Sequence, residues 1–365
     1  MTRDIWRSFD FWLLGAVAVL TVFGIAMIRS AMAGNEELLA IFSRQILFAV
    51  AGFVVLIATA WLDYRLWRTI SRVLYVIVAV ALAIITVAGA AQGGAARWLN
   101  LGFILIQPSE LAKIVMILIL ADFFARNQYK EHNLRWVARS LIPTMGMVIP
   151  ILLQPDLSTS ITVMVIWFAL LWASGLQLKH LVAFGIGGIL LAGIGFPFLE
   201  DYQQQRVINF LFPDPNARYG EIYNVNQALV TIGSGGWFGQ GYEQASQVQL
   251  RFLKVRHTDF IFSAMSAEFG FVGAAVVLIL LGFVIWRCLH AASIAHDTYG
   301  ALICYGVATF IFFHTIVNVG MNLNLIPVTG LPLPFISYGG SSLLSLMLGI
   351  GLVESVVLRH KALEF

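Results

Sequence analysis

Charged residues and cysteines are scarce in this sequence. Only 11% of the 365 residues are Asp, Glu, Lys or Arg, whereas soluble globular proteins carry about 25%. The two cysteines, Cys288 and Cys304, form no C-x-x-C pair and have no metal-ligand spacing, so no disulfide framework is implied. The net charge of +3 is small. Because the basic residues lie in short loops between apolar segments, we expect no nucleic-acid binding.

Hydrophobic residues make up 59% of the chain, and the mean hydropathy is +0.86. A helix that spans a membrane needs ~20 mostly apolar residues. Segments of this kind predict an all-α integral membrane protein with ten transmembrane helices, forming a single membrane domain over residues 1–365. The segments lie near residues 10–29, 46–62, 73–91, 104–124, 137–153, 158–174, 180–199, 260–286, 299–320 and 337–358.

The first apolar segment has two interpretations. The Ala-Met-Ala sequence at residues 31–33 resembles a signal-peptidase site, and Arg3 and Arg7 precede the segment. However, the apolar run is longer than the ~7–15 residues of a signal peptide. We therefore expect a retained helix rather than a cleaved one.

Basic residues are distributed unevenly between the two sets of loops. Thirteen Lys and Arg residues lie on the side of the chain termini, and three lie in the opposite short loops. This positive-inside pattern predicts that both termini are cytoplasmic. The outward-facing segments would then be a large loop at residues 200–258 and shorter loops around 92–103, 154–157 and 321–336.

Several polar groups fall on the predicted outer side. Glu110 and Lys113 are three residues apart at the start of a helix, so they share a face. They form either an ion pair that neutralises itself within the bundle or a site where Lys113 meets an anionic head group. Arg97 and Trp98 are either membrane-interface anchors or substrate contacts.

Three further outer segments carry unusual residues. Asp156 follows a Gln-Pro pair and is either a helix cap or part of the site. The long loop contains Arg206, Arg218 and a glycine-rich stretch at 233–241, which either forms a plain loop or lets backbone approach a ligand. Residues 327–342 combine prolines with small hydroxyl residues, including Ser341. They predict backbone that lines a wet cavity, or close packing of small residues.

Asp259 is the strongest catalytic candidate. It lies where the long loop enters an apolar helix, and ionisable groups at such places are expensive and usually functional. If residues 259–270 are helical, Asp259 shares a face with Ser263 and Ser266, while Glu268 lies about half a revolution away. Asp259 would therefore act as a lone base, with His257 as a possible neighbour. Nearby cations suit an anionic substrate such as a lipid-linked diphosphate.

Five motifs carry a family resemblance. They are Gln-Pro-Ser-Glu at 107–110, Gln-Pro-Asp-Leu at 154–157, the glycine-rich block at 235–241, His-Thr-Asp-Phe-Ile-Phe at 257–262, and the Pro-Leu-Pro-Phe-Ile-Ser-Tyr-Gly-Gly-Ser-Ser block at 332–342. The chain resembles the SEDS family (shape, elongation, division and sporulation) over residues 10–358. Departures include Lys254-Val255 before the histidine, Ala267-Glu268 in place of a Glu pair, and Ser158 in place of a glycine.

The resemblance implies a function and a set of partners. It implies a GT-C-like bundle and a peptidoglycan glycosyltransferase that polymerises lipid II at the outer face of the bacterial plasma membrane. The expected partners are a class B penicillin-binding protein, undecaprenyl-linked glycan and other membrane proteins of the elongation complex. The family's essential aspartate corresponds to Asp259. Its cavity-lining blocks contain Trp98, Glu110, Lys113, Asp156 and Ser341.

We therefore hypothesise an inverting transfer with Asp259 as general base. Arg97, Lys113, Arg206 and Arg218 are candidates to stabilise the departing diphosphate, together with a divalent cation such as Mg or Mn. No acidic cage for such an ion is visible in the sequence. Two alternatives stay open, a lipid II flippase and a non-enzymatic scaffold that activates a penicillin-binding protein.

Overall fold

The computed structural model describes residues 8–32, 39–91, 98–100, 105–128, 134–176, 178–214, 220–253 and 255–360. The expected all-α architecture is confirmed, and a pair of two-residue antiparallel strands, β1 and β2, is its one addition among these residues. The elements in order are α2 (Phe11–Met32), α3 (Leu39–Trp61), α4 (Tyr64–Ala91), β1 (Leu99–Asn100), β2 (Leu105–Ile106), α5 (Pro108–Arg126), α6 (Leu134–Leu153), α7 (Leu157–Ala173), α8 (Leu178–Gly195), η3 (Phe196–Phe198), α9 (Asp201–Leu211), α10 (Gly220–Ser234), α11 (Ser246–Gln249), α12 (Ile261–Ile294), α13 (Thr298–Asn322) and α14 (Gly340–Leu358).

Each of the ten expected apolar segments coincides with a helix. Among the described residues, seven helices are long and apolar enough to cross a membrane, namely α2, α3, α4, α6, α12, α13 and α14. The others that match an expected segment are α5, α7 and α8, of which α7 and α8 are shorter apolar helices. The chain is thus a multi-pass membrane protein, and the count of ten crossings stays a prediction.

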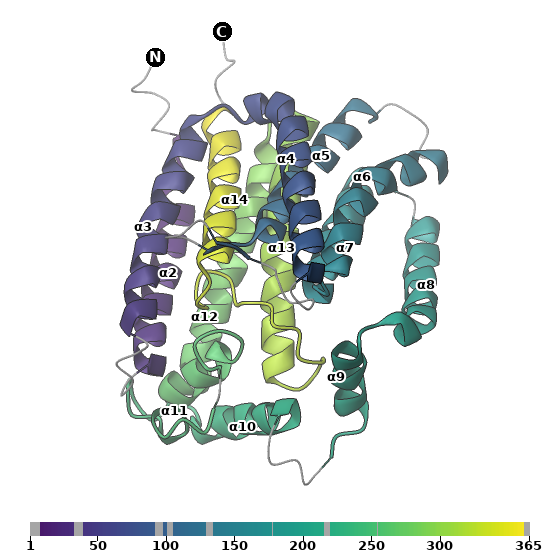
Figure 1. The fold of residues 1–365 in the computed structure, drawn as a ribbon. Coiled ribbons are helices and arrows are strands. Elements are labelled where there is room, and N and C mark those ends of the chain that lie inside the picture. The colour runs from purple at the N-terminus through teal and green to yellow at the C-terminus, as the bar shows by residue number, and fades with distance from the viewer. Residues whose placement is uncertain are drawn as a thin grey trace.

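The main differences from expectation lie in α4 and in the 200–258 segment. α4 begins at Tyr64 rather than near residue 73, because its first turns carry arginines that an apolar window leaves out. The 200–258 segment, expected as a loop, contains α9, α10 and α11. These three helices lie together at one end of the bundle, opposite the end where the chain begins and finishes (Figure 1).

α2 is an integral part of the bundle. It packs against α12 and α3, and the backbone carbonyl of Ala31 accepts a hydrogen bond from the Arg256 side chain, 2.5 Å away. Gly24 lets α2 approach the segment before α14, since a Cβ at Gly24 would lie 2.6 Å from Ile336 Cα. These contacts favour a retained helix over a cleaved signal peptide.

The core of the bundle depends on close helix packing. α14, the most deeply buried of the candidate spans, packs most extensively against α3. Gly351 permits this approach, because a Cβ there would lie 2.6 Å from the Leu56 carbonyl oxygen. A Cβ at Gly340 would in turn overlap the Phe48 ring. Small residues at a helix interface let the backbones come close, as is usual in membrane bundles.

α12 is broken at Gly270, which has φ 68° and ψ −167°. The break frees backbone groups, and the glycine-rich segment at 235–241 pairs with them. Gln240 and Gly241 donate backbone N–H groups to the carbonyls of Ala267 and Glu268, at 2.9 and 3.0 Å. Across the break, the amides of residues 271 and 272 donate to the carbonyls of residues 236 and 237, at 2.9 and 3.1 Å. The glycine-rich segment thus lies in direct backbone contact with α12.

We expect Gly239→Ala to destabilise the protein by about 2–4 kcal/mol. Gly239 has φ +81°, and a Cβ would overlap the Glu268 carbonyl, so both backbone strain and overpacking oppose the change. The measurement is thermal stability followed by size-exclusion chromatography of the detergent-solubilised protein. Gly282→Ala in the middle of α12 is the control, since nothing lies within 4 Å of its Cβ position. Equal stability of the two variants would contradict the role assigned to Gly239.

Candidate active site

Asp259 lies in a turn, two residues before α12 begins at Ile261. Its backbone carbonyl accepts hydrogen bonds from two amides of α13. Asn318 Nδ2 is 3.2 Å away and Asn322 Nδ2 is 2.9 Å away. The condition that residues 259–270 are helical is not met at Asp259, which lies in the turn before α12. α13 thus holds the backbone of Asp259, and the Asp259 carboxylate takes no part in these two hydrogen bonds.

The segment before α14 holds the other side of this turn. The Ser337 hydroxyl donates to the Thr258 carbonyl at 2.8 Å, and the Tyr338 backbone N–H donates to the His257 carbonyl at 2.9 Å. The Asp259 carboxylate lies beside Gly330, where a Cβ would be 3.8 Å from Oδ2. Residues 257–259 and 329–338, two motifs far apart in the sequence, thus form one site.

The serines and the second acid of α12 have other partners. Ser263 donates its hydroxyl to Asn322 Oδ1 at 2.6 Å, and Ser266 bonds to its own helix backbone. Glu268 accepts a hydrogen bond from Ser30 of α2. Because its surroundings belong to α2, Glu268 is separate from Asp259. The inference that this helix does not offer a two-carboxylate arrangement is consistent with these contacts.

Glu110 and Lys113 form a buried ion pair. Lys113 Nζ lies 2.8 Å from Glu110 Oε2, and the Lys113 side chain has no exposed surface. The same ammonium lies 3.4 Å from His314 Nε2 and 4.8 Å from the centre of the Phe310 ring. Since Lys113 is a donor, His314 Nε2 accepts and Nδ1–H faces the Pro332 carbonyl, 3.3 Å away. The pair is neutralised within the protein and linked to the segment before α14.

Asp156 caps α7. Its Oδ1 accepts the Thr159 backbone N–H at 3.2 Å, and its Oδ2 accepts from the Thr159 hydroxyl at 2.9 Å and from Gln107 Nε2 at 3.2 Å. The capping interpretation is confirmed. Gln107 also donates its backbone N–H to the Ser341 hydroxyl at 3.2 Å. Asp156 and Ser341 are therefore joined through Gln107, at the same level of the bundle.

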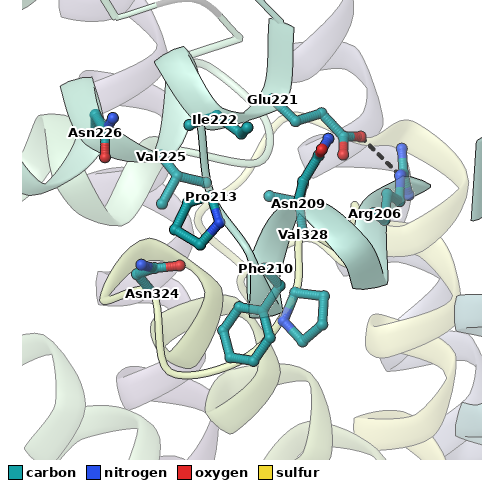
Figure 2. A pocket seen from close by; sticks show the side chains of 11 residues that line it. Arg206, Asn209, Phe210, Pro213, Glu221, Ile222, Val225, Asn226, Asn324 and Val328 are labelled. Atoms are coloured by element: carbon teal, nitrogen blue, oxygen red, sulfur yellow. Dashed lines mark hydrogen bonds and ion pairs between the residues drawn. The ribbon is translucent and has the colours of Figure 1, made fainter. Parts of the chain in front are cut away.

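Arg206 lies on α9 and lines a pocket with residues of α10 and of the segment after α13. Figure 2 shows it paired with Glu221, with Nε 2.7 Å from Oε1. The remaining wall comes from residues that include Asn324, Pro327 and Val328. Val328 in this wall is two positions before Gly330, beside which the Asp259 carboxylate lies. The wall of the pocket is therefore continuous in sequence with the residue beside Asp259.

Burial raises the pKa of the Asp259 carboxyl above its ordinary value. The positive charge of Arg206 and a hydrogen bond from Thr258 act in the opposite direction and lower that pKa. Burial and the charge of Arg256 lower the pKa of His257. His257 is thus a neutral neighbour, with its ring 6.1 Å from that of Tyr338.

The structure describes only one of the three remaining predicted site residues. Trp98 precedes β1 and is 49% exposed. Arg97 and Arg218 lie outside the described residues. The structure thus brings Asp259, His257 and the 329–338 segment together, joins Lys113 to them through His314, and leaves Trp98 at the surface.

Sequence reasoning did not predict the role of three residues of α13. His314, Asn318 and Asn322 are all fully buried and make the contacts that hold Asp259 and Pro332 in place. Their spacing of four residues puts them on one helix face. Polar residues repeated at this interval within an apolar segment were a readable signal of an internal polar contact.

The residues near Asp259 do not fit a cage for a divalent cation. Such an ion needs several oxygen ligands, and no group of three or more His, Cys, Asp or Glu residues occurs within the part of the chain that the structure describes.

Comparison with known proteins identifies the family. Residues 6–362 match the model of the FtsW/RodA/SpoVE family of cell cycle proteins. The chain belongs to this family. Relatives within the FtsW/RodA/SpoVE family include the peptidoglycan glycosyltransferase MrdB of Escherichia coli K12, which is 35% identical over 94% of this chain and 92% of its own length. Stage V sporulation protein E of Bacillus subtilis 168 is 32% identical over 95% of this chain and 96% of its own length.

Solved structures of this family share the fold. The rod shape determining protein RodA of Thermus thermophilus is 29% identical, has a TM-score of 0.72 and matches 99% of both chains. A chain from a peptidoglycan synthase complex that coordinates polymerisation and crosslinking is 30% identical, with a TM-score of 0.81 over 97% of this chain and 98% of that chain. These likenesses support a RodA-like member of the FtsW/RodA/SpoVE family.

The buried ion pair allows a direct test. We expect Lys113→Met to destabilise the protein by about 3–5 kcal/mol, because Glu110 is left as an unpaired buried charge. The double variant Glu110→Gln/Lys113→Met removes both charges and should recover most of the lost stability. Thermal unfolding in detergent measures both effects. A double variant no more stable than Lys113→Met would show that the two charges do not compensate each other.

Proposed function

We propose that this chain is a peptidoglycan glycosyltransferase that polymerises lipid II into glycan strands and releases undecaprenyl diphosphate, for cell elongation and rod shape. The family supports the activity, because relatives of this chain carry that name. The observation that carries the mechanism is Asp259. Its backbone is fixed by Asn318 and Asn322, while its carboxylate lies beside Gly330 near a polar pocket.

Asp259 acts as the general base. It takes the proton from the 4-hydroxyl of the acceptor GlcNAc, and the resulting oxygen attacks the anomeric carbon of the donor MurNAc. The new glycosidic bond forms as the bond to the diphosphate breaks, with inversion at the anomeric carbon. Burial raises the pKa of Asp259, which makes it a better proton acceptor than an ordinary carboxylate. Positioned base catalysis contributes typically 10²- to 10⁴-fold.

The departing diphosphate needs positive charge. Among the described residues, Arg206 is our candidate to supply it. Arg206 lines the pocket, and its charge lowers the pKa of Asp259. Arg97 and Arg218 are proposed for the same task. Lys113 is fully buried and paired with Glu110, so we assign the pair to holding His314 and Pro332. Trp98, His257, Asp156 and Ser341 are proposed to border the substrate.

The location and partners follow from this function. We place the chain in the bacterial plasma membrane with both termini cytoplasmic and Asp259 on the extracytoplasmic side, in line with the distribution of Lys and Arg. A class B penicillin-binding protein would cross-link the product, which agrees with the likeness to a chain of a peptidoglycan synthase complex. A divalent cation would be held through the substrate diphosphate. Chelation during the assay tests that need.

The central experiment is polymerisation of lipid II by the purified chain alone, analysed by gel electrophoresis. We expect Asp259→Asn to lower the rate by about 10²- to 10⁴-fold. The variant should remain folded, because the bonds from Asn318 and Asn322 go to the backbone carbonyl. Asp201→Asn, at an exposed position on α9, is the control and should keep the wild-type rate. Full activity of Asp259→Asn would refute the base assignment.

The same assay separates the alternatives. A flippase would move lipid II across a vesicle membrane without making polymer. A scaffold would give polymer only with a partner that has its own transferase domain. We expect polymer from the chain with a partner that has only transpeptidase activity, and none when Asp259 is replaced.

The rate should depend on pH through Asp259. The base must be deprotonated, so the rate falls as the pH drops through its raised pKa. Arg206→Gln removes a charge that lowers this pKa, and we expect the acid limb of the pH–rate profile to move to higher pH. Glu221→Gln leaves Arg206 uncompensated and should move the limb to lower pH. Shifts of the same sign in both variants would contradict the coupling.

A further inference from the structure

Three arginines surround one buried carboxylate at the end of the bundle away from Asp259. Asp122, near the end of α5, accepts from Arg68 Nε of α4 at 2.5 Å and from Arg126 Nε at 2.7 Å. Arg72 Nη2 lies 3.6 Å from its second oxygen. We refer to Arg68, Arg72 and Arg126 around Asp122 as the cationic cluster.

The cationic cluster carries an excess of positive charge. Three guanidinium groups face one carboxylate, which leaves two charges uncompensated. Within the described ranges, no second carboxylate pairs with any of the three arginines. Their side chains are 37%, 62% and 48% exposed, and each guanidinium has five N–H donors. Donors therefore remain available to an anion.

Two stacked aromatic residues lie next to Arg68 of the cluster. Arg68 lies over the ring of Tyr299, 5.6 Å from its centre, and Tyr299 stacks on Tyr64 at 6.2 Å. The Tyr299 hydroxyl is buried and has no hydrogen-bond partner in the described part of the chain. Arg68 thus lies between Asp122 and a stacked pair of tyrosine rings.

An apolar surface continues from the cluster along α4. After the exposed Arg72, the same helix presents exposed valine and isoleucine side chains over several turns, at Val73, Val76, Ile77, Val80 and Ile84. Positive charge followed by an apolar stripe matches an amphiphile whose anionic head meets the arginines. Basic pockets between transmembrane helices are known to bind phosphate head groups of lipids.

The cluster is separate from the proposed active site. α5 carries Glu110 and the Gln107 contacts at its first turn and Asp122 in its last turn. Glu110 and Asp122 are twelve residues apart, which is roughly 18 Å at the helical rise of 1.5 Å per residue. The cluster therefore lies toward the membrane surface opposite the one where Asp259 is placed.

We infer that the cationic cluster binds the phosphate group of an anionic bilayer phospholipid, with an acyl chain along the exposed face of α4. The bound lipid offsets the excess charge and occupies the leaflet opposite Asp259. This binding does not depend on the proposed transferase activity, because neither the substrate nor Asp259 takes part in it.

The test is native mass spectrometry of the full chain purified from nanodiscs of defined composition. We expect phosphatidylglycerol to remain bound and phosphatidylcholine to be lost. Arg72→Gln leaves the Arg68 and Arg126 contacts to Asp122 in place and should weaken retention of phosphatidylglycerol about fivefold, as one basic residue near the surface contributes. Arg139→Gln removes the same charge from an exposed position early in α6 and should leave retention unchanged.

Asp122→Asn distinguishes binding from a structural role. It raises the excess charge, so phosphatidylglycerol should be retained at least as well as in the wild type, even where thermal stability falls. Equal retention of both lipids, or equal loss in Arg72→Gln and Arg139→Gln, would overturn the proposal. Displacement by soluble glycerophosphate, which lacks acyl chains, would show a site for a free anion and overturn the lipid assignment.

Discussion

The site depends on one constraint, that backbone groups outside regular helices must find hydrogen-bond partners within the protein. In a membrane, water cannot supply these partners to irregular backbone that contacts lipid. α13 meets this need at Asp259 through Asn318 and Asn322, and the segment before α14 meets it at His257 and Thr258. The turn that carries the carboxylate is thus fixed from two sides by contacts that do not involve the carboxylate.

The break in α12 obeys the same constraint. At Gly270 the helix loses its own bonds, and the 235–241 segment replaces them on both sides of the break. This ties α10 and the loop after it to the helix that follows Asp259. The pocket of Arg206 is lined by residues of α9, of the first turns of α10 and of the segment after α13 (Figure 2), so α10 connects the break in α12 to the pocket.

Much of the fold was predictable because spanning length and hydropathy act locally. Ten apolar segments coincide with helices for this reason. The start of α4 was not predictable from hydropathy. Its residues Arg68 and Arg72 pair with Asp122 of α5, and a local sequence window does not contain that contact. The way in which the backbone of Asp259 is held was not predictable on the same grounds, because the amides that hold it belong to a helix about sixty residues later.

The motifs singled out Asp259 as a candidate, but not the contacts around it. The tertiary structure was needed to show that the glycines of 235–241 approach the backbone of α12.

The burial of Lys113 changes the electrostatic account of the reaction. A charge paired at 2.8 Å with an opposite one acts at a distance as a dipole, so its field falls more steeply than that of a free charge. A departing diphosphate would then be stabilised by other cations, whose charge is less completely cancelled at the site. Arg206 is also paired, at 2.7 Å with Glu221, but its side chain is 32% exposed and its charge still lowers the pKa of Asp259. Arg206 therefore remains our proposed candidate to act on both the base and the leaving group.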